Sequence, residues 1–358
     1  MNKVLEYFKN NDTLAIEKDL ITVYGWQNEY EHLLISSVSK YLFEDLNIIE
    51  NIVPVNDDNR PGVVKPNKYI TVHDTGDASP LHNASFWSSA VFNRNWEHKV
   101  GELIPYKCSY QYVVDNDSIY HNVPDNEVAY HAGCGTRFDY NLYDSGLTGN
   151  NLRPKVTISK GGYYEIDGLK SNILAPRYKV VKDDIVIEDR VAYTSDINDQ
   201  GILCKLIDGK YYIGETYFNI GYKKICNHGG NNNSVGIESC ITEGTDLFYT
   251  WQKTSKLVAY LMDKENLTID DVVQHHYFSG KNCPQTMREN HKWEKVLDLI
   301  KFEYDILKFI KEGYKIELIT TDDRILPNGR VVSDNITNIK YIIRTTYNDV
   351  VEELEVIK

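Results

Sequence analysis

The sequence lacks any long apolar run. No stretch of roughly 18 or more apolar residues occurs among its 358 residues, so we expect no membrane-spanning helix. Residues 2–10 interleave charged and polar side chains with apolar ones, which predicts that no signal peptide is present. Internal repeats, low-complexity tracts, a glycine-rich phosphate loop and a Ser-His-Asp order are also missing. These absences argue against repeat proteins, phosphate-loop nucleotide-binding proteins and serine hydrolases.

Basic residues are fewer than acidic residues in this sequence. The chain has 39 Lys and Arg against 52 Asp and Glu, which gives a formal net charge of -13 at pH 7. A nucleic-acid partner would require a basic face, so we expect none. The 42% hydrophobic and 25% charged fractions are typical of a globular protein, and the length allows about two to three domains.

Cysteine is present but scattered. A small disulfide-stapled scaffold has closely spaced cysteines, and the spacing here predicts mostly reduced thiols. The six cysteines are Cys108, Cys134, Cys204, Cys226, Cys240 and Cys283.

The segment from Asp271 to Pro284 holds several candidate metal-ligating and charged side chains within a short stretch. It begins with a short apolar run, typical of the end of a buried strand. His275 and Cys283 then offer an imidazole and a thiolate, the donors that zinc prefers. Two ligands from one loop and a distant third would leave the open fourth position that catalytic zinc keeps for water. Lys281 should point into the same site. Ordinary loop chemistry is the alternative that this pattern alone leaves open.

Two other segments predict strands with polar side chains on one face. In residues 69–75 apolar residues alternate with polar ones, which places His73 opposite the apolar pair at the carboxyl end of the strand. Such strand ends collect function in α/β folds, although a partly exposed histidine without a partner is the simpler reading. In residues 231–241 the same alternation turns Glu238 to the side of His73. A carboxylate on a buried strand is costly unless it has a partner or a role.

The run Gln-His-His-Tyr-Phe-Ser-Gly-Lys-Asn-Cys-Pro at residues 274–284 resembles the metal loop of zinc-dependent N-acetylmuramoyl-L-alanine amidases of type 2. These enzymes share the fold of phage T7 lysozyme and the peptidoglycan recognition proteins. A strand ending in His-x-Thr at 73–75 and the His-Ala-Gly at 131–133 are also similar to the family. The resemblance covers about residues 60–133 and 228–300. It implies an α/β fold with a mixed central β-sheet flanked by helices.

The resemblance implies three groups of site residues. The expected ligands of one zinc ion are His73, His275 and Cys283. The expected catalytic residues are Glu238 as general base, with Lys281 and Tyr110 stabilising the oxyanion. The expected substrate contacts are Thr75, His131 and Asn232. For Tyr110 and His131, an ordinary strand tyrosine and loop histidine are the alternatives.

The implied activity is hydrolysis of peptidoglycan at the amide between N-acetylmuramic acid and L-alanine, by a zinc-activated water. Without a signal peptide, we expect a phage endolysin that stays in the cytoplasm of the producing cell and acts on the wall after release. One alternative is a non-catalytic peptidoglycan-binding module of the same fold; such modules typically lose the cysteine ligand, which this chain keeps at Cys283. A purely structural zinc site would need a fourth protein ligand, for which His276 is the adjacent candidate. The oligomeric state is left open.

The chain is expected to have several parts. We predict an N-terminal lead-in at 1–59, partly helical, because residues 29–46 carry apolar residues at helical spacing. The amidase domain at 60–302 is interrupted by a β-rich insertion at 134–228, which is too long for a structureless loop. A small C-terminal β segment, of immunoglobulin-like kind, occupies 313–358.

Helices are expected at three places in the amidase domain. Residues 79–98 and 248–262 have the apolar spacing of amphipathic helices, and a further helix starts at about residue 289. Thr245 or Asp246 can cap the second of these helices.

Overall fold

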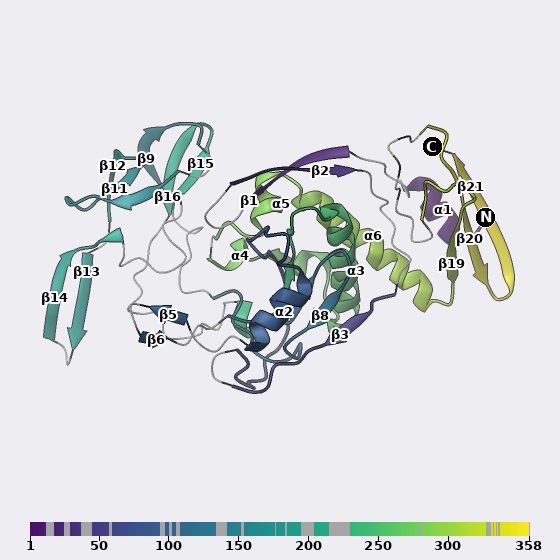
Figure 1. Ribbon diagram of the computed structural model, residues 1–358, viewed down its shortest axis with the longest axis horizontal. Helices are drawn as coiled ribbons and strands as arrows, with labels where there is room; N and C mark the ends of the chain where they lie inside the picture. Colours follow the sequence, from purple (N-terminus) through teal and green to yellow (C-terminus); the bar gives the residue numbers. More distant parts are fainter. Residues whose placement is uncertain are drawn as a thin grey trace. The chain divides into compact units, whose positions relative to one another are not determined.

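The structure of the chain is a computed structural model (Figure 1). It describes residues 1–11, 18–24, 29–36, 45–56, 59–93, 97–99, 102–104, 108–133, 142–151, 154–175, 177–182, 185–194, 204–214, 230–279, 281–326, 331, 333, 335 and 337–357. The chain divides into two compact units. The first comprises residues 1–130, 234–273 and 283–358, and the second comprises residues 131–233 and 274–282.

The largest sheet has six strands among the described residues, in the order β18-β4-β17-β7-β8-β3. These strands are β3 (Ile48–Glu50), β4 (Tyr69–Asp74), β7 (Tyr112–Val114), β8 (Ile119–His121), β17 (Ser234–Ser239) and β18 (Val272–Gln274). β17 runs parallel to both β4 and β7, β8 is antiparallel to β7, and β3 is parallel to β8. The predicted mixed central sheet is confirmed.

One face of this sheet is covered by two long helices, α3 (Leu247–Glu265) and α6 (Trp293–Lys311). The apolar residues that alternate along β4 and β17 form one buried core with the apolar stripes of these helices. Asp246 caps α3 by accepting a hydrogen bond from the main-chain N–H of Tyr249. The helix ends at Asn266, whose φ of 57° is left-handed. The helix predicted over residues 248–262 is confirmed as α3, and the helix predicted from about residue 289 is present as α6 but begins at Trp293.

The other face carries α2 (Ala84–Asn93). Ala84 and Val91 pack on Val113 of β7 and on Cys240, which follows β17. The predicted helix at 79–98 is wrong at its ends, because residues 97–99 form β5 (Glu97–Lys99), which pairs with β6 (Glu102–Ile104). The unit also contains two short elements, a 3-10 turn, η4 (Ile269–Asp271), and α5 (Gln285–Glu289).

The predicted helix over residues 29–46 is wrong where the structure describes it. Residues Glu29–Ser36 form β2, an antiparallel partner of β1 (Lys18–Tyr24), and residues 37–44 lie outside the described residues. Ile21 and Val23 of β1 are buried in the core that α3 and α6 share with the sheet. Hydrogen bonding to a neighbouring strand thus overrides a weak local helical pattern.

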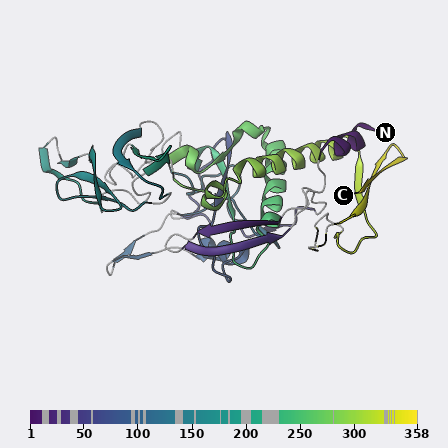
Figure 2. The same ribbon diagram turned by 90° about the horizontal axis from the view of Figure 1, so that it is seen from above.

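The two ends of the chain pack together in the first unit (Figure 2). Helix α1 (Lys3–Asn10), capped by Asn2, shares a core with the second half of α6 and with an antiparallel sheet. The strands of that sheet are β19 (Lys315–Ile319), β20 (Lys340–Tyr347) and β21 (Val350–Ile357). β3, which lies inside the expected lead-in, belongs to the central sheet. The domain boundaries expected from the sequence remain a proposal.

The second unit is rich in strands, as the insertion was predicted to be. One three-stranded sheet has the order β15-β16-β9, another has the order β10-β11-β12, and β13 pairs with β14. The strands are β9 (Leu142–Thr148), β10 (Val156–Ile158), β11 (Tyr163–Ile166), β12 (Leu169–Leu174), β13 (Arg177–Lys182), β14 (Ile185–Val191), β15 (Cys204–Ile207) and β16 (Lys210–Gly214). A core of its own buries Tyr164, Ile166, Tyr211 and Ile213. The 3-10 turn η3 (Gly230–Asn232) and α4 (His276–Ser279) also belong here.

Among the described residues, Cys108, Cys204, Cys240 and Cys283 take part in no disulfide bond, and Cys134 and Cys226 lie outside the described residues. Within the described part of the chain, no helix has both the length and the apolar character needed to cross a membrane.

Candidate metal centre

Strand pairing places a histidine beside a carboxylate at the carboxyl end of the parallel strands. His73 of β4 and Glu238 of β17 are register partners, so their side chains share one face of the sheet. The Nδ1 atom of His73 lies 3.9 Å from Oε1 of Glu238. The His73 side chain is almost fully buried, whereas that of Glu238 keeps 15% of its surface exposed. The Glu238 side chain is therefore partly open to solvent, although its Oε2 atom is buried, and it lies next to an enclosed imidazole.

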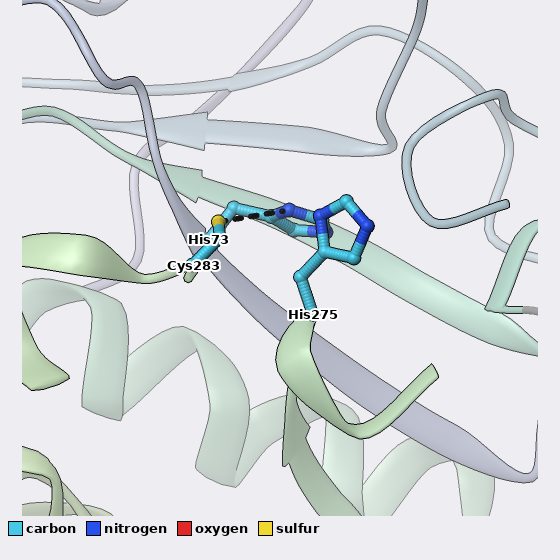
Figure 3. Close-up of side chains that lie close together, drawn as sticks. All are labelled: His73, His275 and Cys283. Atoms are coloured by element: carbon cyan, nitrogen blue, oxygen red, sulfur yellow. Dashed lines mark hydrogen bonds between the residues drawn. The ribbon is translucent and has the colours of Figure 1, made fainter. Parts of the chain in front are cut away.

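Three buried donor side chains converge at this point. Ligand atoms of His73, His275 and Cys283 all lie within 4.8 Å of one another, and Figure 3 shows the two rings and the thiol side by side. His275 follows β18, and Cys283 precedes α5. The Sγ atom of Cys283 is 3.6 Å from Nδ1 of His73. Zinc–sulfur and zinc–nitrogen bonds of ordinary length, at a tetrahedral angle, put these two atoms about 3.6 Å apart. The donor types and this spacing fit a zinc ion.

The electrostatic surroundings keep one of these donors neutral. Burial, and then the positive charges of Lys281, His131 and His276, hold the pKa of His275 well below its ordinary value. A neutral imidazole presents the lone pair that a metal ion requires. Lys281 is thus close enough to His275 to act on it electrostatically, and the direction of its ammonium group into the site stays a prediction. The cluster contains His275 and not its neighbour His276.

Asp74 holds the segment that follows Cys283. Its Oδ2 atom accepts a hydrogen bond of 2.6 Å from the main-chain N–H of Thr286, in α5. Asp74 directly follows His73, so this bond joins the end of β4 to the start of α5. Asp74 is not among the site residues that the sequence predicts. Its only sequence signal is an acidic residue next to a proposed ligand at a strand end.

Asn231 fixes the His-Ala-Gly segment. Its Oδ1 atom accepts hydrogen bonds from the main-chain N–H groups of His131, at 2.8 Å, and Ala132, at 2.7 Å. The main-chain N–H of Asn231 donates back to the carbonyl of Ala132 at 3.2 Å. Gly230 must lack a side chain here, because a Cβ would lie 2.7 Å from Cβ of Ala132. The sequence pattern indicated Asn232 in the same asparagine run, and no local signal distinguishes Asn231.

The remaining expected site residues are placed as follows. The Tyr110 ring is buried against α2, and its hydroxyl donates to the main-chain carbonyl of Trp87 at 3.0 Å. Thr75 donates its main-chain N–H to the carbonyl of Ser239, and its hydroxyl oxygen is buried with no hydrogen-bond partner among the described residues. Asn232 lies in η3. The catalytic role of Tyr110 and the substrate contacts of Thr75, His131 and Asn232 remain predictions.

Comparison with known proteins gives several similarities. Residues 64–156 match the family model described as N-acetylmuramoyl-L-alanine amidase, a segment that includes His73 and ends before Glu238 and Cys283. The chain is 31% identical over 144 residues to the N-acetylmuramoyl-L-alanine amidase CwlH of Bacillus subtilis (strain 168). The aligned residues cover 40% of this chain and 50% of CwlH. It is 22% identical over 242 residues to the N-acetylmuramoyl-L-alanine amidase XlyA of the same organism. This alignment covers 68% of this chain and 48% of XlyA.

The chain thus spans about half the length of these curated relatives. Among solved structures, the catalytic domain of XlyA aligns with a TM-score of 0.40 and 21% identity, over 71% of this chain and 99% of that domain. The resemblance that the motifs predicted is confirmed: through residues 64–156 the chain matches the family of N-acetylmuramoyl-L-alanine amidases.

Proposed function

We propose that the chain is a zinc-dependent peptidoglycan hydrolase that cleaves the amide between N-acetylmuramic acid and L-alanine. The observation that carries the proposal is the cluster of His73, His275 and Cys283, with Glu238 beside His73. The match of residues 64–156 to the amidase family, and the two amidase relatives, support the reaction class.

The donor set suits a catalytic ion better than a structural one. Structural zinc sites usually have four protein ligands, whereas catalytic sites keep three and leave one position open. Three His and Cys donors converge among the described residues. When bound, the zinc ion would polarise the scissile carbonyl and lower the pKa of a water molecule toward neutrality.

The side chains around the cluster have roles in this proposal. Glu238 takes a proton from the attacking water and passes it to the leaving amine nitrogen of L-alanine. Its exposed fraction and its position next to His73 support this role. The Lys281 ammonium stabilises the negative charge that develops on the carbonyl oxygen, a role supported by its electrostatic effect on His275.

The reaction has a direct test. Purified protein is incubated with bacterial walls of several types, and new L-alanine amino groups are measured against new reducing sugars. We expect amino groups to appear without reducing sugars, and zinc to be present in the purified protein by metal analysis. Release of reducing sugars alone would refute amide cleavage. Wall binding without release of either product would favour the non-catalytic binding module.

A further inference from the structure

An aromatic cluster lies on the surface at the start of α2. The rings of His82 and Phe86 stack, with centroids 3.9 Å apart and an interplanar angle of 11°. Trp87 packs edge-on against Phe86, with centroids 5.3 Å apart at 83°. Phe86 nevertheless keeps 39% of its surface exposed. An ordered aromatic ring that remains in contact with water is available to a ligand.

The imidazole in this stack has a fixed orientation. Nδ1 of His82 lies 2.9 Å from Oδ2 of Asp77, while Oδ1 of Asp77 accepts a hydrogen bond of 2.9 Å from the main-chain N–H of Ser79. The Asp77 contact leaves Nε2 on the other side of the ring, where it has no hydrogen-bond partner among the described residues. The cluster therefore combines an exposed apolar ring with a polar nitrogen held in place.

Hydrogen bonds anchor this segment to the carboxyl ends of the parallel strands. Glu243, which follows β17, donates its main-chain N–H to the carbonyl of Ala78 at 2.9 Å. The Thr242 hydroxyl donates to the carbonyl of His82 at 3.0 Å. The main-chain N–H of Ala84 donates to Asp115, directly after β7, at 2.8 Å. Because β4, β17 and β7 are parallel, their carboxyl ends lie at one edge of the sheet. The aromatic cluster is thus at the edge where β4 carries His73.

The cluster is also on the side of the sheet that carries the proposed site. Val113 packs against Ala84 of α2 and is the register partner of Glu238. Register partners on neighbouring strands point to the same face, so α2 covers the face that displays Glu238 and His73. His82 and Phe86 therefore lie at the edge of the sheet, and on the face of it, that carry the proposed catalytic groups.

A sugar ring matches this combination. One face of a pyranose carries mainly C–H groups and packs on an aromatic ring, and its hydroxyl groups form hydrogen bonds at the rim. We propose that Phe86 and His82, with Asp77 orienting the imidazole, form a saccharide subsite that binds the sugar adjacent to the N-acetylmuramic acid whose amide is cleaved. The identity of the saccharide rests on the proposed function, because that reaction places a glycan strand at this edge.

The helix offers a matched control. Phe92 is also 39% exposed and lies in α2, but the ring contacts of Phe86 with His82 and Trp87 are not made by Phe92. Replacing either phenylalanine by alanine removes the same exposed ring from the same helix. A purely structural contribution of an exposed ring should be similar for the two. If Phe86 belongs to a saccharide subsite, only Phe86→Ala should weaken glycan binding.

The experiment measures binding of peptide-free glycan strands, prepared from bacterial walls, by titration of the full-length protein. We expect the wild-type chain to bind them, Phe86→Ala to weaken binding by about three- to tenfold, and Phe92→Ala to leave it unchanged. Phe86→Tyr keeps the ring and should retain binding, and circular dichroism and zinc content should be the same for all variants. His82→Ala should also weaken binding.

Turnover gives a second readout. On intact walls Phe86→Ala should raise KM while kcat is retained, and on a single-sugar muramoyl-peptide with no neighbouring sugar the same variant should match the wild type. Absence of glycan binding by the wild type, or equal effects of Phe86→Ala and Phe92→Ala, would overturn the subsite. Glycan binding that depends on Phe86, found together with no amide release, would support the subsite and refute only the proposed reaction.

Discussion

The Asp74 carboxylate and the main-chain N–H of Thr286 are joined by a hydrogen bond of 2.6 Å, although the two residues are 212 positions apart in the chain. Both are buried. Asp74 directly follows His73, and Thr286 lies three residues after Cys283. A buried carboxylate is stable only where it is hydrogen-bonded or paired, and this bond meets that need while holding two proposed ligand segments in register.

We predict that Asp74→Ala lowers zinc affinity by about 10- to 100-fold, the range typical of residues that support metal ligands. The physical reason is that the main chain after Cys283 loses its attachment to β4. Competition with a chelator of known affinity measures the effect. Asp74→Asn keeps an oxygen that can accept this hydrogen bond, so its loss of zinc affinity should be smaller. Asp298→Ala, at an exposed position on α6, is the control. Unchanged zinc affinity in Asp74→Ala would contradict the positioning role.

Cys283→Ser should remove most of the zinc and the activity, because a hard hydroxyl replaces a thiolate. Zinc per chain is measured by metal analysis after dialysis. Cys204→Ser is the control: burial raises the pKa of Cys204 to about 12, so its thiol stays protonated near neutral pH and it is a poor ligand. Full zinc occupancy in the Cys283 variant would show that Cys283 is not a ligand.

Glu238→Gln separates catalysis from binding. We expect the variant to keep its zinc and its affinity for walls, while kcat falls by roughly two to four orders of magnitude, because the amide cannot accept the proton of the water. The assay is release of L-alanine amino groups at saturating substrate. Glu243→Gln, an exposed position five residues later, should behave as the wild type. Wild-type turnover in the Glu238 variant would mean that another group takes the proton.

The insertion has a core of its own, which buries Tyr164 and Tyr211. We therefore expect that replacing residues 137–225 by a short Gly/Ser linker leaves a folded, zinc-loaded protein. It should cleave a small muramoyl-peptide normally but act worse or less selectively on intact walls. Circular dichroism, zinc analysis and the two assays measure these outcomes.

Two results of the deletion would count against this picture. Loss of zinc or failure to fold would show that the insertion belongs to the core of the amidase fold. Equal activity on both substrates would show that the insertion has no role in recognising the wall. The linker variant also retains His131 and Asn231, which lie on either side of the insertion. The main-chain N–H of His131 donates a hydrogen bond to Oδ1 of Asn231.

His121 should make stability depend on pH. Burial lowers its pKa, but the carboxylates of Asp125, 3.5 Å from Nε2, and of Glu50, hydrogen-bonded to Nδ1 at 2.9 Å, outweigh burial, and the net shift of the pKa is upward. A folded-state pKa above the unfolded value of about 6.5 adds stability that is complete below that value and is lost as the pH rises through the folded pKa. Between about pH 6 and pH 8.5 the melting temperature of the wild type should therefore fall relative to that of His121→Gln. If the melting temperatures of the two proteins changed with pH in the same way, the upward shift of the His121 pKa would be contradicted.

Much of the candidate site follows from local sequence patterns. The period-2 alternation in residues 69–75 and 231–241 was sufficient to predict that His73 and Glu238 share a face, because side-chain direction in a strand depends only on position along it. The spacing of His275 and Cys283, with the donor preference of zinc, indicated two ligands on one loop. The apolar stripe of α3 and its Asp246 cap are also local signals.

Other features depend on contacts between distant segments. Residues 29–36 carry a helical pattern but form β2, because pairing with β1 satisfies their main-chain groups. The hydroxyl of Tyr110 donates to the main-chain carbonyl of Trp87 in α2, a contact that no local pattern in the sequence indicates.

The sequence by itself determined which side chains lie on one strand face and which donor types the loop offers. Only the tertiary structure decided that Asp74 anchors the segment after Cys283 and that Asn231 holds His131. The reason is that a hydrogen bond between residues far apart in the chain leaves no periodic trace in either segment. It forms only when the sheet brings those segments together.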